Sequence, residues 1–331
     1  MNAQLSFVHA LSALHAGVGQ GAGVIDLPIA REKATGLPFL PGSSVKGALR
    51  TRAFLDANEN KDLKALYTCI FGPENNDGPD ARASMVQFSD QKLLLLPVRS
   101  LAGTFAWITS PYILRRLARD SRDIGLALPD QVPTIPTDEK KRCLITNGGA
   151  AIVMPIKGEK KVYLEDLELE MQADDGAREW AKWIGSYVFP VKQDGNDKDT
   201  AQKNAENTAW QTILNDRFCV VHDDVFNFLI TTATEVTARI RLQENSKTVV
   251  DGGLWYEEAL PTETILSGIV MATPHKDENG HAIQIQGHDL TAERIFKALK
   301  GLGNTTIQLG GKATVGRGIC HVQLVDNAEE K

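Results

Sequence analysis

Two residues at the ends of a glycine-rich segment, His15 and Asp26, have side chains of the types that hydrolytic chemistry uses. A carboxylate can hold a divalent cation or orient a hydroxyl group, and a histidine can carry a proton between reacting groups. An aspartate before Leu-Pro is also a common turn residue, and a single histidine after a strand is often structural. Spacing alone therefore leaves a catalytic and a structural role open for both.

The segment that follows Pro41-Gly42 combines a helix start with two cations. Ser43 and Ser44 are residues typical of a helix N-terminus. Lys46 and Arg50 follow four residues apart, which places them on one face of the helix. Amide hydrogens, hydroxyl groups and two positive charges together predict a binding site for a phosphate backbone.

A glycine-rich loop near the end of the chain, residues 310–318, is a second candidate anion site. Glycines allow a ligand to approach the backbone closely, and successive amide hydrogens can form an anion-binding concavity. The loop is not a Walker motif, because strand residues follow it rather than a helix. An ordinary glycine hairpin explains the spacing equally well. Its candidate binding residues are Gly311, Lys312, Thr314 and Arg317.

The overall charge limits the kind of nucleic-acid site that the chain can have. The formal net charge is −6, so the molecule as a whole repels a polyanion, and an RNA site must be a local group of cations. Three acid-free stretches supply such groups: residues 43–52, residues 309–318, and residues 236–243 with Arg239 and Arg241.

Cysteine usage and hydropathy indicate the cellular compartment. The four cysteines are scattered without a Cys-x-x-Cys pair, which favours a reducing compartment and gives no zinc motif. The first residues lack the basic and apolar regions of a signal peptide. No apolar run reaches about 18 residues, the length of a membrane span. We therefore expect a cytoplasmic protein with no membrane partner.

The elements that must position these residues alternate irregularly along the chain. Residues 4–14 have the two-residue period of a strand, helices are predicted over 43–57 and 62–70, and residues 236–242 and 253–260 alternate like the arms of a long antiparallel hairpin. A doubly wound parallel sheet would show more regular units. The pattern favours an α+β fold of ferredoxin or RNA-recognition-motif type that carries polar insertions.

Three motifs together resemble the RAMP superfamily of CRISPR-associated proteins, and most closely the backbone subunit of the type III-B (Cmr) RNA-targeting complex. The first is Asp-Leu-Pro-Ile-x-Arg-Glu at residues 26–32. The second is Gly-x-Pro-x-x-Pro-Gly-Ser-Ser-x-Lys-Gly-x-x-Arg at residues 36–50, and the third is Gly-Gly-x-x-Thr-x-Gly-Arg-Gly at residues 310–318. The resemblance extends to the hairpin segment Leu-Trp-Tyr-Glu-Glu at 254–258.

The resemblance implies a single domain over residues 1–331. It would have a ferredoxin-like palm, a β-hairpin thumb at 236–260, and candidate insertions at 120–150, 190–210 and 273–290. In that family the aspartate of the first loop is the cleavage residue, which here is Asp26, and the resemblance makes it the ligand of a divalent metal, Mg²⁺ or Mn²⁺. The loop histidine matches His15. A helper acid and tyrosine would fall on Glu258, or the adjacent Glu257, and on Tyr256.

The partners implied by the resemblance are a CRISPR guide RNA, a complementary target RNA, further copies of the chain in a helical filament, and the other subunits of the Cmr complex. Target cleavage would occur at six-nucleotide intervals, with Ser43, Ser44, Lys46, Arg50 and the 310–318 loop contacting the RNA backbone. Two alternatives remain: a non-catalytic guide-RNA scaffold, and an endonuclease that processes the CRISPR precursor RNA.

Overall fold

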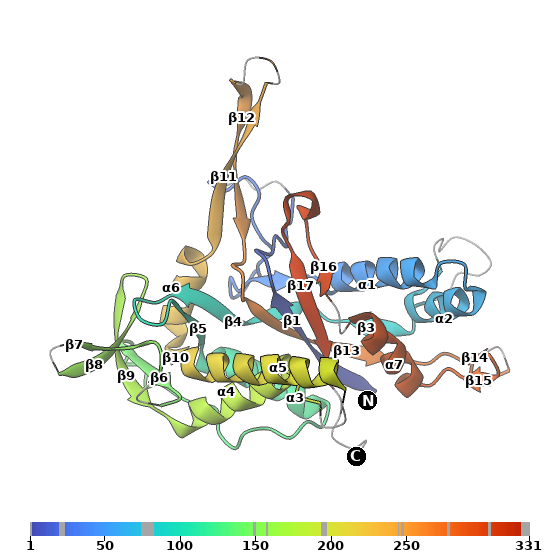
Figure 1. The fold of residues 1–331 in the computed structure, drawn as a ribbon, viewed down its shortest axis with the longest axis horizontal. Helices are drawn as coiled ribbons and strands as arrows, with labels where there is room; N and C mark the ends of the chain where they lie inside the picture. Colours follow the sequence, from blue (N-terminus) through green and yellow to red (C-terminus); the bar gives the residue numbers. More distant parts are fainter. Residues whose placement is uncertain are drawn as a thin grey trace.

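The fold is described from a computed structural model, which covers residues 2–19, 24–73, 83–147, 150–156, 158–192, 197–243, 245, 248–276, 279–303 and 306–325. One large mixed sheet runs through the molecule, with helices on both faces (Figure 1). A long two-stranded hairpin projects away from it.

One end of the sheet is the ferredoxin-like unit that the sequence predicted. Its four strands are β1 (Ala3–Ala10), β4 (Gln91–Arg99), β13 (Ile265–Ala272) and β17 (Ile319–Leu324). They lie in the order β17-β1-β13-β4, and each neighbouring pair is antiparallel. Helices α1 (Gly42–Ala57) and α2 (Lys61–Phe71) connect the first two strands, and α7 (Ala292–Gly303) connects the last two. This is the strand–helix–strand, strand–helix–strand connectivity of the ferredoxin fold.

The sheet is covered on both sides, which explains why even the polar residues of β1 are buried. All eight residues of β1 are buried. Helices α1 and α7 contact each other, and α7 packs on β13 and β17, whereas α3 (Pro111–Asp123) packs on β4 and β13. Because a strand points alternate side chains to opposite faces, burial of consecutive residues requires a covering layer on each face.

The other end of the sheet continues from β4 through six further strands within the described residues. The order is β4-β5-β10-β6-β9-β8-β7, with mixed directions. The strands are β5 (Phe105–Thr109), β6 (Arg142–Ile145), β7 (Val153–Ile156), β8 (Glu159–Leu164), β9 (Leu167–Ala173) and β10 (Phe218–Val221), and the helices α4 (Asp175–Val188), α5 (Lys198–Arg217) and α6 (Asp223–Thr232) accompany them. Strands β8 and β9 are separated by a tight turn, at which Glu165 has a positive φ of 48°.

Helix α5 lies largely within the candidate insertion at 190–210 and begins with a polar half. The side chain of Asp197 caps the helix by accepting a hydrogen bond from Thr200 N at 2.9 Å. The polar first half is continuous with Trp210, Ile213 and Leu214, which pack against the core. Tertiary burial of the second half thus stabilises a helix whose first half has little apolar periodicity.

The projecting hairpin consists of β11 (Glu235–Leu242) and β12 (Val249–Ala259), which pair antiparallel with Ala238 opposite Tyr256. The pairing register shifts between Ile240 and Leu242. Gly252 and Gly253 are among the extra residues of β12 at this irregularity. The hairpin lies in the region predicted to be a thumb. Glu244, Ser246 and Lys247, between the two strands in the sequence, lie outside the described residues.

The three candidate insertions have different structures. Region 120–150 contains the end of α3, an extended segment and β6 in the main sheet. Region 190–210 contains most of α5, and region 273–290 contains the small hairpin of β14 (Gln284–Ile285) and β15 (His288–Asp289). The remaining short elements are β2 (Phe39–Leu40), β3 (Val86–Phe88), β16 (Thr306–Gln308) and the 3-10 turn η1 (Ala313–Val315).

Two further observations concern the cysteines and the helices. All four cysteines are free thiols and are buried. Over the described ranges, no helix combines the length and apolar character that crossing a membrane requires.

Candidate RNA-binding and cleavage site

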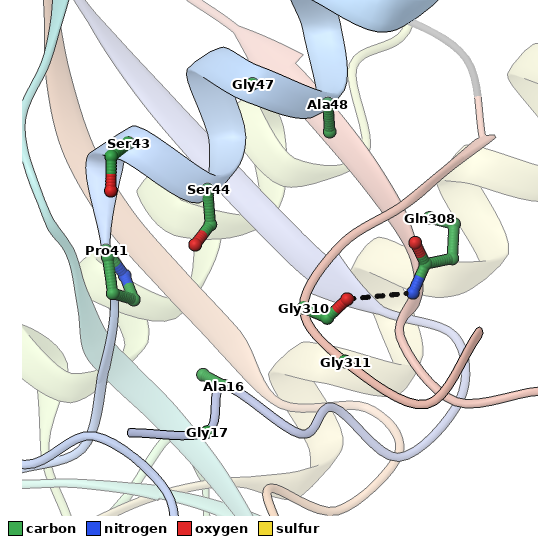
Figure 2. A pocket seen from close by; sticks show the side chains of 10 residues that line it. All are labelled: Ala16, Gly17, Pro41, Ser43, Ser44, Gly47, Ala48, Gln308, Gly310 and Gly311. Carbon is green, nitrogen blue, oxygen red and sulfur yellow. Dashed lines mark hydrogen bonds between the residues drawn. The ribbon is translucent and has the colours of Figure 1, made fainter. Parts of the chain in front are cut away.

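Three segments that are distant in the sequence surround a cavity of about 370 Å³. They are Ala16-Gly17 after β1, the first turns of α1, and the Gly310-Gly311 part of the loop between β16 and β17. Figure 2 shows Ser43 and Ser44 across the space from Gly310 and Gly311. Two of the predicted RNA-binding segments therefore lie at one site.

The N-terminus of α1 presents serine hydroxyls to this cavity. Pro41 occupies the cap position without a side-chain cap bond, and the Gly42 amide donates a 2.9 Å hydrogen bond to the Asp90 carboxylate. Ser43 and Ser44 both line the cavity, and neither hydroxyl has a hydrogen-bond partner among the described residues. These hydroxyls are available to a ligand.

Lys46 and Arg50 share a helix face, as predicted, but this face is not the one that lines the cavity. Lys46 Nζ donates a 2.5 Å hydrogen bond to Ser84 Oγ, and the Arg50 guanidinium lies 5.4 Å from the centre of the Phe54 ring. Burial, together with the positive charge of Arg50, lowers the pKa of Lys46 from its ordinary value of 10.5. The sequence thus predicted correctly that Lys46 and Arg50 share a helix face. Ser43 and Ser44, however, line the cavity, and the two cations do not.

The 310–318 loop is a shaped turn that rests on the segment after β1. Gly311 N donates a 2.9 Å hydrogen bond to the His15 carbonyl. Gly318 has a φ of 75°, and a Cβ there would clash with the carbonyl oxygen of Leu309, so this position requires glycine. Lys312 also has a positive φ, of 68°, and Thr314 is exposed on the 3-10 turn η1. A strand, not a helix, follows the loop, which agrees with the exclusion of a Walker motif.

Asp26 lies on the surface at the base of the hairpin. Its Oδ2 accepts a 2.7 Å hydrogen bond from the backbone N–H of Tyr256, and the adjacent Leu27 forms a parallel bridge to Glu257. The Tyr256 side chain is 41% exposed on the same strand. The structure therefore joins Asp26 and Tyr256, which are 230 positions apart in the sequence.

His15 is buried beside this base rather than exposed in it. Its Nδ1 lies 2.7 Å from the carbonyl oxygen of Glu258, and its ring lies between Gly17 and Gly311. A Cβ added to Gly17 would come within 2.5 Å of His15 Nε2, so only glycine leaves space for the ring.

Glu257 is the centre of a buried charge cluster that links the hairpin to the glycine loop. Its Oε1 accepts hydrogen bonds from Trp255 Nε1 at 2.8 Å and from Lys312 Nζ at 2.9 Å, and Oε2 forms a 3.4 Å ion pair with Arg239. Burial alone would raise the pKa of Glu257, but these hydrogen bonds and the charges of Lys312 and Arg239 outweigh it and hold the pKa below 4.5.

Arg317 adds a further contact between the same two elements. It is only 8% exposed, and its Nη2 donates to Thr237 Oγ1 at 3.2 Å. Its Nη1 lies 3.6 Å from Glu235 Oε2. Arg239, Lys312 and Arg317 are thus brought together at the hairpin base, whereas Arg241 is exposed further out on β11.

The carboxylates near the hairpin do not form a metal centre. The described part of the chain has no group of three histidine, cysteine, aspartate or glutamate side chains placed to hold a metal ion. Glu257 is paired with Lys312, and Glu258 is paired with Arg31 at 2.6 Å. Asp26 keeps Oδ1 without a hydrogen-bond donor among the described residues. One available carboxylate oxygen does not fit a metal site built by the chain alone.

Sequence reasoning assigned no role to Arg31, although it lies within the first motif. Arg31 bonds to Glu258, to Ile230 O on α6 and to Gly36 O. A cation five residues after a candidate catalytic aspartate was the available signal. Its partners could not be found, because Ile230 and Glu258 are about 200 positions away in the chain.

Comparison with known proteins shows the family to which the chain is similar. The sequence profile of the RAMP superfamily matches residues 7–321. The chain is 31% identical over 329 residues to the CRISPR system Cmr endoribonuclease Cmr4 of Pyrococcus furiosus, covering 98% of this chain and 96% of the relative.

Two solved structures share the fold along nearly the whole chain. The crystal structure of oligomeric Cmr4 from Pyrococcus furiosus matches with a TM-score of 0.66 and 25% identity, covering 98% of both chains. A chain of the type III-B Cmr-beta complex bound to cognate target RNA, solved by cryo-electron microscopy, matches with a TM-score of 0.64 and 19% identity, covering 97% of this chain and 96% of that one. The second likeness shows a common fold.

Proposed function

Because the chain belongs to the RAMP superfamily and, within it, to the Cmr4 family, we propose that it is the backbone subunit of a type III-B CRISPR ribonucleoprotein. In this role it binds the guide RNA and cleaves complementary target RNA at six-nucleotide intervals. The endoribonuclease named in the 31% identical relative supports the activity.

The observation that carries the proposal is the position of Asp26. Its carboxylate is exposed at the base of a projecting hairpin and is held there by the Tyr256 amide. Ala16 and Gly17 line the cavity between α1 and the glycine loop, and Gly17 forms an antiparallel bridge to Ile29, three residues after Asp26. A single RNA-binding surface can therefore present a phosphate to a fixed carboxylate.

The chemistry proposed for Asp26 is proton transfer. A carboxylate can accept the proton of a ribose 2′-hydroxyl, and the freed oxygen then attacks the adjacent phosphorus. The 5′-oxygen leaves and takes up a proton, so the products are a 2′,3′-cyclic phosphate and a 5′-hydroxyl end. This reaction needs the attacking oxygen, phosphorus and leaving oxygen in line. We propose that the hairpin produces this geometry by displacing a nucleotide of the target.

The roles of the other site residues follow from their surroundings. Ser43, Ser44, Gly311 and Thr314 are proposed to contact the guide backbone, with Lys46, Arg50, Arg241 and the partly paired Arg239, Lys312 and Arg317 supplying positive charge. His15 and Tyr256 stay predicted participants in cleavage. A divalent metal, Mg²⁺ or Mn²⁺, would use the same available oxygen of Asp26, and Asp26 would then hold the metal near the phosphate instead of accepting the proton.

We also propose the partners of this assembly. They are the guide RNA, the target RNA, further copies of the chain in a helical filament, and the other Cmr subunits, in the cytoplasm. The oligomeric crystal structure of the Pyrococcus furiosus relative supports self-association.

The test uses the complete complex, assembled with a guide RNA and given end-labelled complementary RNA and Mg²⁺. The expected result is a ladder of products spaced by six nucleotides. A ladder that persists in EDTA would support proton transfer by Asp26, and a ladder that disappears would assign Asp26 to a divalent metal. Stable target binding without cleavage would instead support the scaffold alternative. Cleavage of the precursor RNA by the isolated chain would support the processing alternative.

A further inference from the structure

The segment that carries Asp26 is attached to the hairpin like a third strand. Leu27 N donates to Tyr256 O at 3.1 Å, and Glu258 N donates to Leu27 O at 3.0 Å. Two carboxylates extend this pairing in a reciprocal way. Asp26 accepts from Tyr256 N at 2.7 Å, and Glu258 Oε2 accepts from Ile29 N at 3.1 Å. Each carboxylate satisfies an amide of the opposite segment.

A second set of bonds connects this pairing to the start of the hairpin. Glu258 Oε1 accepts from Arg31 Nη2 at 2.6 Å and from Thr234 Oγ1 at 3.0 Å. Arg31 Nη2 also donates to Ile230 O on α6 at 3.0 Å. Thr234 lies in the connection between α6 and β11, so Glu258 and Arg31 link β12, this connection and the Asp26 segment.

The surroundings of Glu258 do not suit a group that exchanges protons with a substrate. It is 3% exposed, and both of its oxygens accept hydrogen bonds. Buried donors hold both oxygens in place, Arg31 and Thr234 at Oε1 and the Ile29 amide at Oε2. Asp26, in contrast, is exposed and has an available oxygen. The two acids at this base therefore have separate tasks.

We propose that Glu258 and Arg31 are positioning residues that couple the hairpin to Asp26. When the hairpin moves against a bound RNA, Asp26 moves with it, because Glu258 and Arg31 fix the Asp26 segment to the hairpin base. The carboxylate thus keeps its position relative to the phosphate that the hairpin exposes. The effect of this coupling on cleavage rests on the proposed function. The attachment of the Asp26 segment to the hairpin does not, and hydrogen exchange can measure it without RNA.

The test compares complexes that contain Arg31→Met, Glu258→Leu or Glu258→Gln with the wild type. Arg178→Met is the matched control, because Arg178 is a surface arginine of α4 that bonds to Asp175. We expect Arg31→Met and Glu258→Leu to lower the single-turnover cleavage rate at least tenfold without changing target affinity. Glu258→Gln keeps one amide oxygen as an acceptor, so its rate should be intermediate, with an unchanged shape of the pH–rate profile.

Hydrogen exchange of the free chain supplies the second measurement. In Arg31→Met the amides of Leu27, Ile29 and Glu258 should exchange faster together, whereas Arg178→Met should leave them unchanged. If Arg31→Met does not assemble, Thr234→Val removes a single bond to Glu258 and should show the same effects in weaker form.

Three results would overturn the coupling: unchanged rate and exchange in Arg31→Met, exchange that changes at only one of the two segments, or loss of one limb of the pH–rate profile in Glu258→Gln. The last result would make Glu258 a proton-transferring residue. A wild-type complex that does not cleave RNA would contradict the proposed function, while the exchange data would still decide whether the segments are coupled.

Discussion

The Nδ1 atom of His15 lies 2.7 Å from the backbone carbonyl oxygen of Glu258. A carbonyl oxygen can only accept a hydrogen bond, so Nδ1 must carry the proton. In the neutral ring Nε2 is then the atom with a free electron pair, and it faces Gly17. The bond thus fixes both the orientation of the ring and the tautomer.

Substitution Gly17→Ala is expected to displace His15. The added Cβ would come within 2.5 Å of Nε2, so the ring or the backbone that lines the cavity must move. We expect cleavage by the assembled complex to fall at least tenfold, measured as the single-turnover rate.

Gly301→Ala is the matched control for this glycine substitution. A Cβ at Gly301 of α7 meets no atom within 4 Å, and alanine should raise the free energy of unfolding by about 0.5–1 kcal/mol. Wild-type cleavage by Gly17→Ala would show that the close packing of His15 is irrelevant to the reaction.

Asp26→Asn should lower cleavage by about two to four orders of magnitude, the usual effect of removing a general acid or base. The amide oxygen can still accept the hydrogen bond from Tyr256 N, so the hairpin base should remain intact. Assembly and target affinity should equal those of the wild type in a filter-binding assay. A variant that cleaves at the wild-type rate would remove Asp26 from the mechanism.

Lys46→Ala combined with Arg50→Ala should weaken guide binding for all RNA sequences. Each lost phosphate contact should lower the salt dependence of log K by about 0.7 for a single strand. Titration of guide affinity against salt measures this slope, with Ser43→Ala and Ser44→Ala on the cavity face for comparison. If the slope stays the same in the Lys46/Arg50 double variant, this helix face does not contact phosphate.

The outer face of the hairpin should be required for cleavage but not for target pairing. Ile240 and Leu254 pair across the hairpin and are 53% and 54% exposed, so replacing both with serine should leave the fold intact. If these side chains displace a nucleotide, the cleavage rate falls while target binding, which depends on base pairing, does not. Leu55→Ser on α1, also exposed, is the control; an undiminished six-nucleotide ladder would place the wedge elsewhere.

The Glu257 cluster should make the hairpin base sensitive to acid. Because the folded protein holds the pKa of Glu257 below 4.5, the unfolded state binds more protons in this range. The resulting stabilisation is complete well above pH 4.5 and is lost as the pH falls through the lower folded-state value. Thermal melting between pH 3 and 6 should show a steeper loss of stability for the wild type than for Glu257→Gln. Parallel curves would mean that the ion pairs of Glu257 with Lys312 and Arg239 do not stabilise the folded protein.

The sequence by itself determined the ferredoxin-like unit, the long hairpin and two of the three segments that line the cavity. Periodicity, proline and glycine positions, and local spacing are properties of neighbouring residues, and they suffice for β1, α1 and the 310–318 loop. They also grouped Lys46 with Arg50, since helical spacing is local.

Only the tertiary structure decided which way these groups face and which partners they have. The bonds from Asp26 to Tyr256 and from Arg31 to Glu258 join positions more than 200 residues apart, so no local pattern contains them. Likewise, α5 is stabilised by the packing of Trp210, Ile213 and Leu214 against the core. Lys46 turns from the cavity toward Ser84. Long-range packing sets burial and hydrogen-bond partners, and these decide the tasks of chemically equal side chains such as Asp26 and Glu258.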